Sequence, residues 1–452
     1  MVRQPTATPG NAARVLRIVH EDGPVTRAEL TRRTGLNRST ILALVGELVE
    51  GGLVLEEVPS AGTPGVGVGR PSGVVRASGD VLAAAVTVEI DAVGVALVAL
   101  DGTVRDRLVE PQATVPTAAQ AIDAVERILG VLSARTATRA RTAPGARIVG
   151  TGVAVPGIVR VEDGTVRNAP HLGWRDEPLA VPLAERLGLP VRAANDANLG
   201  AWAERLYGSA RGVDALVYLN GGASGIGGGI VSAGRPFSGA DGYAGELGHT
   251  FVAANGIRCH CGAVGCLETE ASRSALTDVT ATLPDDLDAL AAALAEHRPE
   301  VERVVDRQVT ALATALRNAI HTVDPEVVVL GGFLSTLLGH VGDRVENDVR
   351  AQTMAAMTDR LRIVPAALGR DVLVRGAAEL GFRDLLRDPT AARLDPTAAR
   401  RDPTPARRDP TPARRDPRSA PADTTTTPTR APDRTTTHTS DRDDAAEEAR
   451  TP

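Results

Sequence analysis

The stretch VLAAAVTVEIDAVGVALVAL, residues 81–100, decides the fold class of the central part of this chain. It holds two apolar runs, residues 81–88 and 93–100, that are rich in β-branched valine and separated by a polar turn. Short apolar runs bounded by turn residues are typical of buried strands. The stretch therefore predicts a pair of neighbouring strands.

Similar apolar runs follow residue 100, and longer amphipathic segments lie between them. The predicted strands are RIVGTGVAV (147–155), ALVYL (215–219), GIGGGIV (225–231) and EVVVLGG (326–332), and the predicted helices are residues 118–132, 199–206 and 301–322. Strands that alternate with helices in this way indicate an α/β body.

The composition divides the chain into three parts. A length of 452 residues exceeds the roughly 250–300 residues at which a single core stops growing. The first 78 residues form short amphipathic stretches without Phe, Trp or Tyr, and the residues from 387 onward also lack them. We therefore expect domains at 1–78 and 79–386, followed by a tail at 387–452.

The tail repeats the pair Asp-Pro every seven residues. The repeats begin at Asp388, Asp395, Asp402, Asp409 and Asp416. A seven-residue period is also the period of a coiled coil, but a proline in every repeat removes a helical hydrogen bond and clashes with the preceding turn. The composition predicts a disordered tail, either without a binding role or with a weak electrostatic one.

Residues 1–78 contain the pattern of a helix-turn-helix. The predicted helices span 12–20, 26–33 and 38–50, and Gly35 separates the last two. Thr26 followed by Glu29 is a capping box at the start of the second helix. Such an arrangement can place its last helix in the major groove of DNA.

The side chains at the start of that last helix suit nucleic acid. Asn37, Arg38, Ser39 and Thr40 are short or forked hydrogen-bonding residues, which suit base edges and phosphates. Residues 53–76 predict a two-stranded wing whose tip carries Arg70, and an arginine there can enter the minor groove. The alternative is a structural three-helix bundle followed by a linker.

The charge distribution favours DNA binding by this module. Nine arginines against seven acidic residues give residues 1–78 a net charge of +2, whereas the whole chain carries −6. One small module buries little surface, so operator DNA would be bound by a homodimer or homotetramer with regularly spaced half-sites.

The composition also excludes several functions. Every one of the fifty basic residues is arginine, so nucleotide sites and Schiff-base enzymes that depend on lysine are excluded. The sequence shows neither an apolar span nor a signal peptide, which predicts a cytoplasmic protein without a membrane partner.

All three cysteines lie close together. Cys259, Cys261 and Cys266 follow His249 in GHTFVAANGIRCHCGAVGC. Three thiolates and one imidazole form the ligand set of a closed tetrahedral zinc site, which leaves no position for activated water. We predict a structural zinc, with His260 as the competing fourth ligand.

Six segments in this order resemble the ROK family, which contains bacterial sugar kinases and repressors. They are AVPGIV (154–159), NDANLGAWAE (195–204), GGASGIGGGI (221–230), GELGH (245–249), CHCGAVGCLE (259–268) and VVLGGFLS (328–335), and the similarity extends over about residues 12–385. The resemblance implies two actin-like, ribonuclease H-like α/β lobes with a sugar in the cleft between them.

The resemblance also implies roles for individual residues. Asn195 and Asp196 match the family's sugar-binding pair, and Asp196 is the general base of active kinases. Glu246, His249 and Glu268 match further sugar ligands. Carboxylates and carboxamides can form hydrogen bonds with sugar hydroxyls. A buried polar group that is left without such a partner costs about 1–3 kcal/mol. His249 would then contact both the metal and the sugar.

The nucleotide side departs from the family pattern. Residues of the glycine-rich phosphate loops are present at Gly221, Gly222, Gly225, Gly227, Gly331 and Gly332. The first phosphate turn is replaced by residues 89–94, where Asp91 brings a carboxylate and Val93 replaces a hydroxyl residue. Phosphoryl transfer depends on electrostatic positioning of the phosphates, so Mg-ATP binding is not expected.

The sequence therefore predicts a repressor of carbohydrate genes that responds to a monosaccharide or a sugar phosphate. An ATP-dependent hexose kinase of the ROK family, with Asp196 as its catalytic base, is the alternative. A zinc protein without a ligand is a third hypothesis.

Overall fold

The computed structural model describes residues 10–57, 73–140, 146–222, 225–283 and 286–390. The wing tip with Arg70 and nearly all of the predicted disordered tail lie outside these residues. Within them, no helix combines the length and the apolar character that crossing a membrane requires.

The first elements form a winged helix-turn-helix, as predicted. They are α1 (Asn11–Asp22), β1 (Val25–Thr26), α2 (Arg27–Thr34), α3 (Arg38–Glu50), β2 (Val54–Glu57) and β3 (Val74–Ala77), and the sheet order is β1-β3-β2. The Thr26 hydroxyl caps α2 by accepting the Glu29 N–H. The Glu29 carboxylate instead accepts hydrogen bonds from Arg32, so only half of the predicted capping box forms.

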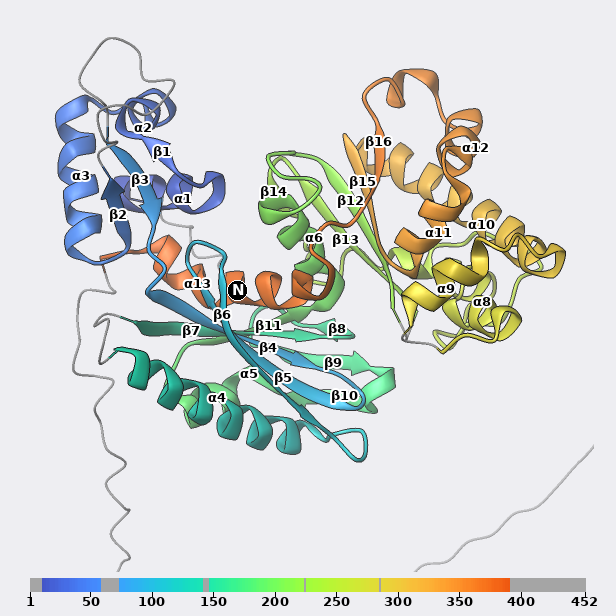
Figure 1. The fold of residues 1–452 in the computed structure, drawn as a ribbon, viewed down its shortest axis with the longest axis horizontal. Helices are drawn as coiled ribbons and strands as arrows, with labels where there is room; N and C mark the ends of the chain where they lie inside the picture. Colours follow the sequence, from blue (N-terminus) through green and yellow to red (C-terminus); the bar gives the residue numbers. More distant parts are fainter. Residues whose placement is uncertain (1–9, 58–72, 141–145, 223–224, 284–285, 391–452) are drawn as a thin grey trace, which may run out of the picture. The chain divides into compact units, whose positions relative to one another are not determined.

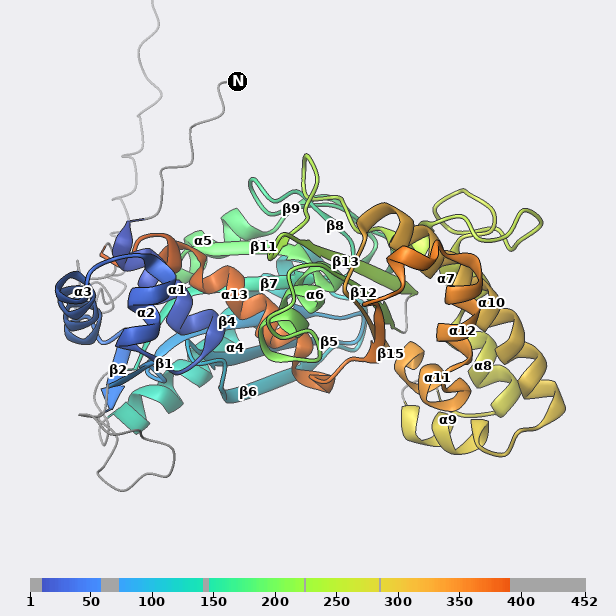
Figure 2. The ribbon, with the colours of Figure 1, turned by 90° about the horizontal axis from the view of Figure 1, so that it is seen from above.

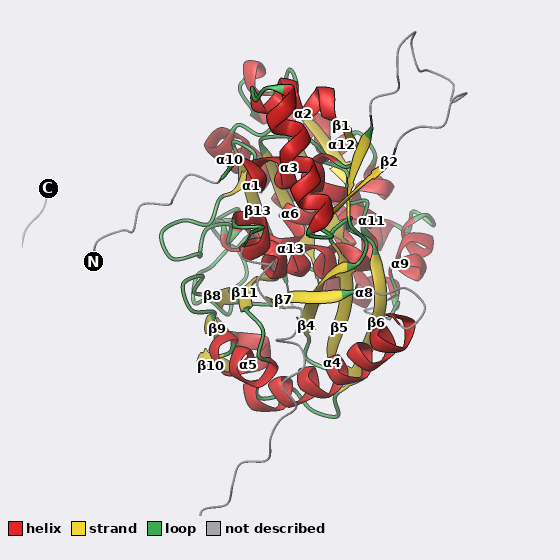
Figure 3. Cartoon of the chain, turned by 90° about the vertical axis from the view of Figure 1, so that its left-hand side faces the viewer, coloured by secondary structure: helices red, strands yellow, loops and turns green. Residues whose placement is uncertain are grey.

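The first lobe is a five-stranded sheet covered on both faces. Its elements are β4 (Val81–Val88), β5 (Ala92–Ala99), β6 (Val104–Pro111), α4 (Ala118–Ala140), β7 (Arg147–Val155), α5 (Ala180–Leu187) and β11 (Val191–Asn195), in sheet order β11-β7-β4-β5-β6. A small antiparallel sheet adds β8 (Ile158–Val159), β9 (Thr165–Ala169) and β10 (Trp174–Pro178). Helix α4 covers one face of the large sheet and α13 (Val372–Arg387) covers the other (Figures 1 and 3).

The second lobe is another five-stranded sheet, in the order β14-β13-β12-β15-β16. Its strands are β12 (Leu216–Gly221), β13 (Ile226–Ser232), β14 (Arg235–Pro236), β15 (Val327–Gly332) and β16 (Arg362–Pro365). Its helices are α7 (Leu267–Glu270), α8 (Arg273–Thr280), α9 (Leu287–Leu294), α10 (Pro299–Val323), α11 (Phe333–Val341) and α12 (Arg344–Gln352). Helix α6 (Asp196–Tyr207) packs on the opposite face of this sheet from α10 and α11 (Figure 2).

The winged helix and the first lobe share one hydrophobic core. Val15 and Leu16 of α1 belong to the same buried cluster as Ala83 of β4 and Phe382 of α13. The last helix therefore connects the winged helix to the body, although α1 and α13 lie at opposite ends of the described chain.

Candidate functional site

A cavity of about 630 Å³ opens at the amino end of α6, and residues of both lobes line it. All five predicted sugar-contacting residues are among them: Asn195, Asp196, Glu246, His249 and Glu268. The structure thus brings together side chains that lie up to 73 positions apart in the sequence. Both carboxylate and carboxamide groups line this cavity, so it can accept and donate hydrogen bonds to a polyhydroxylated molecule.

The first two of these residues are fixed by the start of α6. The Asn195 side chain caps the helix by accepting the Asn198 N–H at 3.0 Å, and it donates to the Gly157 carbonyl at 3.1 Å. Asp196 accepts the Ala197 N–H at 2.7 Å. Desolvation in the cleft, together with the smaller effects of the carboxylates of Glu89 and Glu246, raises the pKa of Asp196 to about 7. This part of the cleft therefore disfavours additional negative charge.

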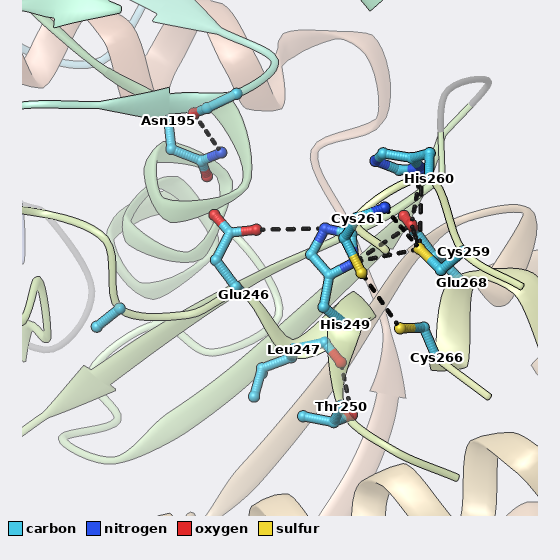
Figure 4. Close-up of polar contacts among 12 residues, drawn as sticks. Asn195, Glu246, Leu247, His249, Thr250, Cys259, His260, Cys261, Cys266 and Glu268 are labelled. Atoms are coloured by element: carbon cyan, nitrogen blue, oxygen red, sulfur yellow. Dashed lines mark hydrogen bonds and ion pairs between the residues drawn. The ribbon is translucent and has the colours of Figure 1, made fainter. Parts of the chain in front are cut away.

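His249 lies between two carboxylates. Its Nε2 is 3.9 Å from Glu246 Oε2, and its Nδ1 is 3.3 Å from Glu268 Oε1. Figure 4 shows Glu246 on the side toward Asn195 and the cysteines on the other side of the ring. Burial raises the pKa of Glu246. One imidazole thus faces the cavity with one nitrogen and the cysteine cluster with the other.

The cysteine cluster can hold a metal ion. His249 and the three cysteines each offer one ligand atom, and these four atoms lie within 4.8 Å of one another. Cys261 Sγ is 3.7 Å from Cys266 Sγ, and Cys259 Sγ is 3.7 Å from His249 Nδ1. Metal–sulfur bonds of about 2.3 Å in a tetrahedron place two sulfurs about 3.8 Å apart. Two of the donor pairs therefore already have tetrahedral spacing, and all four donor atoms lie close enough to surround one metal ion.

His260, the competing fourth ligand, belongs to a different group. It lies with His249 and Glu268 in a second set of possible ligands that contains no cysteine. Its Nδ1 is 3.2 Å from Glu268 Oε1 and 3.9 Å from Cys259 Sγ. The geometry therefore favours His249 as the partner of the cysteines and leaves His260 beside the cavity.

The loop around the cysteines is shaped by glycine. Gly265 has φ +77°, and a Cβ there would lie 1.8 Å from the Ala253 carbonyl oxygen. The Glu270 carboxylate fixes the far side of the loop by accepting the Ile257 N–H at 2.6 Å. These contacts hold Cys259 and Cys266 in place from the backbone.

The predicted phosphate-loop glycines divide into two groups. Gly222, Gly225 and Gly227 line the cavity. The others are packing positions, because a Cβ on Gly221 would strike the Phe333 ring at 2.3 Å and one on Gly332 would strike the Gly221 carbonyl at 2.1 Å. Gly331 is similarly confined by Asn220 and Tyr218.

Residues 89–94, predicted to stand in place of the first phosphate loop, carry acidic side chains. Glu89 and Asp91 keep solvent-exposed surface, but neighbouring protein atoms partly desolvate the Glu89 carboxylate. This desolvation, together with the Asp91 charge, raises the pKa of Glu89. Val93 is fully buried in the first-lobe core. Its side chain therefore packs inside the lobe and does not face the cleft.

Sequence reasoning missed one wall of the cavity. The loop between β9 and β10 contributes His171, β10 contributes Trp174 and Arg175, and Asn168 of β9 lines the cavity with them. The Trp174 indole is anchored by donating to the Pro116 carbonyl at 2.9 Å. One available signal was composition, because Trp174 is one of only two tryptophans in the chain.

The candidate DNA-contacting residues differ in whether their side chains are already hydrogen-bonded within the helix. The Asn37 carboxamide caps α3 by accepting the Thr40 N–H at 2.8 Å, and it also accepts the Ser39 hydroxyl at 2.7 Å. Arg38 is exposed. Several of the other described arginines of the module are paired with carboxylates, for example Arg33 with Asp22 at 2.6 Å. Arg38, the one cationic side chain of α3, is therefore placed to reach DNA.

Comparison with known proteins divides the chain in the same way, into an N-terminal winged helix and an α/β body. Residues 88–383 match the model of the ROK family, and residues 8–62 match that of the MarR family. The xylose repressor of Bacillus subtilis is 26% identical over 381 residues, covering 82% of this chain and 94% of the repressor. The glucokinase of Thermotoga maritima is 35% identical over 251 residues, covering 51% of this chain and 78% of the kinase.

A solved structure is similar to this chain over a length comparable to that of the xylose repressor alignment. It is described as a ROK family transcriptional regulator, a homologue of the E. coli MLC protein, and it is 26% identical with a TM-score of 0.68. The similarity covers 83% of this chain and 96% of that one. The match to the regulators therefore includes the winged helix as well as the lobes.

Proposed function

This chain belongs to the ROK family, and we propose that it is a transcription repressor that binds operator DNA as a dimer and responds to a sugar in the cleft. The observation that carries the proposal is the joint presence of a winged helix and a cavity lined by all five sugar-side residues. The repressor of Bacillus subtilis aligns over 82% of this chain, whereas the glucokinase of Thermotoga maritima aligns over 51%.

The charges of the cavity favour an uncharged monosaccharide. Asp196, Glu246 and Glu268 line it, and Arg175 is the one arginine among the described lining residues. A sugar phosphate would bring negative charge toward carboxylates whose pKa values are already raised at Asp196 and Glu246. A neutral sugar can instead donate hydroxyl protons to these groups.

A zinc ion is the metal that three thiolates and an imidazole favour. It would be held by Cys259, Cys261, Cys266 and His249, and it would fix the loop and the orientation of the imidazole. The Nε2 atom of His249 then remains available to the cavity, beside Glu246. The chain's own residues thus place a hydrogen-bonding group against the sugar.

Sugar binding would change DNA binding by bringing the lobes together. Because a ligand shifts an equilibrium only by its preference for one state, the sugar must bind the closed arrangement more tightly. We expect the sugar to release the operator, with a change in operator affinity of roughly 5–150-fold.

The first test is a thermal-shift screen of monosaccharides and their phosphates with the wild type and Glu246→Ala. We expect a neutral sugar to raise the melting temperature of the wild type and to have a much smaller effect on Glu246→Ala. Equal shifts in both proteins would show that the sugar binds elsewhere. A panel without any shift would contradict the sugar-response proposal.

The kinase alternative has its own test. It predicts sugar-dependent release of ADP from ATP, abolished by Asp196→Asn. The acidic turn at Glu89 and Asp91 argues against it. We expect no ADP release with any hexose that shifts the melting temperature.

A further inference from the structure

Helix α1 of the winged helix buries one titratable side chain against the body. Its inward-facing residues are Ala13, Val15, Leu16, Val19 and His20. The His20 side chain is 0% exposed, so its two ring nitrogens depend on protein partners. Nδ1 lies 2.7 Å from the Leu100 carbonyl, and Nε2 lies 2.9 Å from Glu379 Oε2.

The hydrogen bonds favour a charged pair. A carbonyl and a carboxylate both accept, so two bonds from the ring require a proton on each nitrogen. Burial lowers the pKa of His20, but the charge and hydrogen bond of Glu379 and the bond to Leu100 raise it above its ordinary value. α1 is thus held on α13 by an imidazolium–carboxylate contact inside the shared core.

The second oxygen of Glu379 connects this contact to a third helix. Glu379 Oε1 accepts the Tyr207 hydroxyl at 2.6 Å, and Tyr207 is the last residue of α6. The Tyr207 ring packs closely on Gly102, since even an added Cβ at this glycine would lie 2.6 Å from the ring. The ring therefore has little room to shift. The guanidinium of Arg375 lies 5.4 Å from the centre of the same ring. The link is therefore closely packed as well as hydrogen-bonded.

The opposite end of α6 is the sugar cavity. Asn195 caps the helix, and Asp196 is its first residue. Twelve residues of α-helix span about 18 Å. A helix of this length moves as one body, so a shift of its amino end reaches Tyr207. The packing of α6 on α13 is tight, since a Cβ on Gly376 would lie 2.3 Å from the Leu199 carbonyl.

A second contact follows the same route. Arg211, four residues after the end of α6, donates to the Asp22 carbonyl at 2.9 Å. Asp22 is the last residue of α1. The carboxyl end of α6 and the loop after it therefore hold two positions in the last turn of α1, His20 and Asp22.

We propose that α6 and the His20–Glu379–Tyr207 contact transmit sugar binding to the winged helix. Movement of α6 on lobe closure changes the Tyr207–Glu379 hydrogen bond, and Glu379 then holds His20 and α1 in a different position. The inference rests on the proposed function, because it names the route by which the cleft would act on the DNA-binding module.

Tyr207→Phe tests the route, because it removes one hydroxyl from the link and leaves the ring in place. Its matched control is Tyr218→Phe, another buried tyrosine that packs against α6 at Gly200. The probes are D-xylose and D-glucose, together with a DNA fragment that the full-length wild type selects from a random-sequence library. The readout is the ratio of operator Kd values with and without saturating sugar.

We expect Tyr207→Phe to lower this ratio by roughly 2–30-fold while its sugar affinity and its operator affinity without sugar stay close to wild type. Tyr218→Phe should keep the wild-type ratio. Glu379→Gln, which keeps the shape but removes the charge, should lower the ratio in the same direction.

The outcomes separate the two proposals. A wild-type ratio of 1 with D-xylose, D-glucose and every other sugar that raises its melting temperature overturns the proposed function and this inference together. A sugar-responsive wild type with an equally responsive Tyr207→Phe overturns the inference alone. A Tyr207→Phe protein that loses operator affinity equally with and without sugar also overturns it, because the contact would then be structural.

Discussion

At the scale of single residues, the ionisation of Asp196 is the property with the clearest consequence. Its ordinary pKa of 3.8 is raised to about 7, first by desolvation and then by neighbouring carboxylates. Between these two values the unfolded chain has lost the proton and the folded chain keeps it. The folded state therefore binds more protons, and stability falls as the pH rises through this range.

Asp196→Asn should remove this penalty, because asparagine keeps an acceptor for the Ala197 N–H without a charge. We expect the sugar-free variant to melt at a higher temperature than the wild type at pH 8, with a gain of roughly 2–4 kcal/mol. At pH 4 the gain should almost vanish. Melting curves of both proteins at the two pH values measure the difference.

Asp278→Asn is the control for this prediction, since Asp278 is exposed on α8. Its effect should be small and similar at both pH values. A gain from Asp196→Asn that does not grow with pH would show that Asp196 is not desolvated in solution.

At the scale of elements, α3 separates a structural role from a binding role at adjacent positions. Asn37 caps the helix through the Thr40 N–H, and loss of such a cap costs about 0.5–2 kcal/mol. Arg38 is exposed at the start of the same helix. Asn37→Ala should therefore lower the melting temperature, and Arg38→Ala should leave it unchanged.

For operator binding we expect the opposite order, with a larger effect from Arg38→Ala than from Asn37→Ala. Arg38→Ala should weaken operator binding and reduce the salt slope of the binding constant by about one phosphate contact. Gel shifts over a series of salt concentrations measure both quantities. An unchanged affinity for Arg38→Ala would show that α3 does not present this arginine to DNA.

The metal loop gives a second prediction at this scale. Without a metal, burial raises the pKa values of the Cys259 and Cys266 thiols, whereas a bound ion requires thiolates. A strong chelator should therefore lower the melting temperature of the wild type, and added Zn²⁺ should restore it. Cys259→Ser should be insensitive to the chelator, and an unaffected wild type would contradict a structural metal.

The elements were also the level at which the sequence was most informative. Periodicity predicted β7 and α3 with the bounds that the structure has, because apolar spacing reports local burial. The wall formed by His171 and Trp174 carries no such period, so periodicity could not identify it. The His20–Glu379 contact joins residues 359 positions apart, and only the tertiary fold brings them together.

At the scale of the whole molecule, the winged helix is not energetically separate from the body. Its buried residues lie in one cluster with those of β4, β5 and α13. Domains of about 60 residues are marginally stable alone, and this one leaves His20 and an apolar face uncovered when the body is removed. The shared core lets a change in the lobes reach the DNA-binding module.

Phe382→Ala should reveal this shared core. Phe382 is 0% exposed in α13, and its ring lies 5.8 Å from that of His20. The variant should lose about 3–5 kcal/mol of stability and should speed amide hydrogen exchange in α1 and α3. Phe333→Ala, 1% exposed in the second-lobe core, is the matched control, with faster exchange in α11 and β12 but protected amides in α1. Equal protection of α1 in both variants would mean that the winged helix is stabilised by its own core and that the lobes act on it through surface contacts alone.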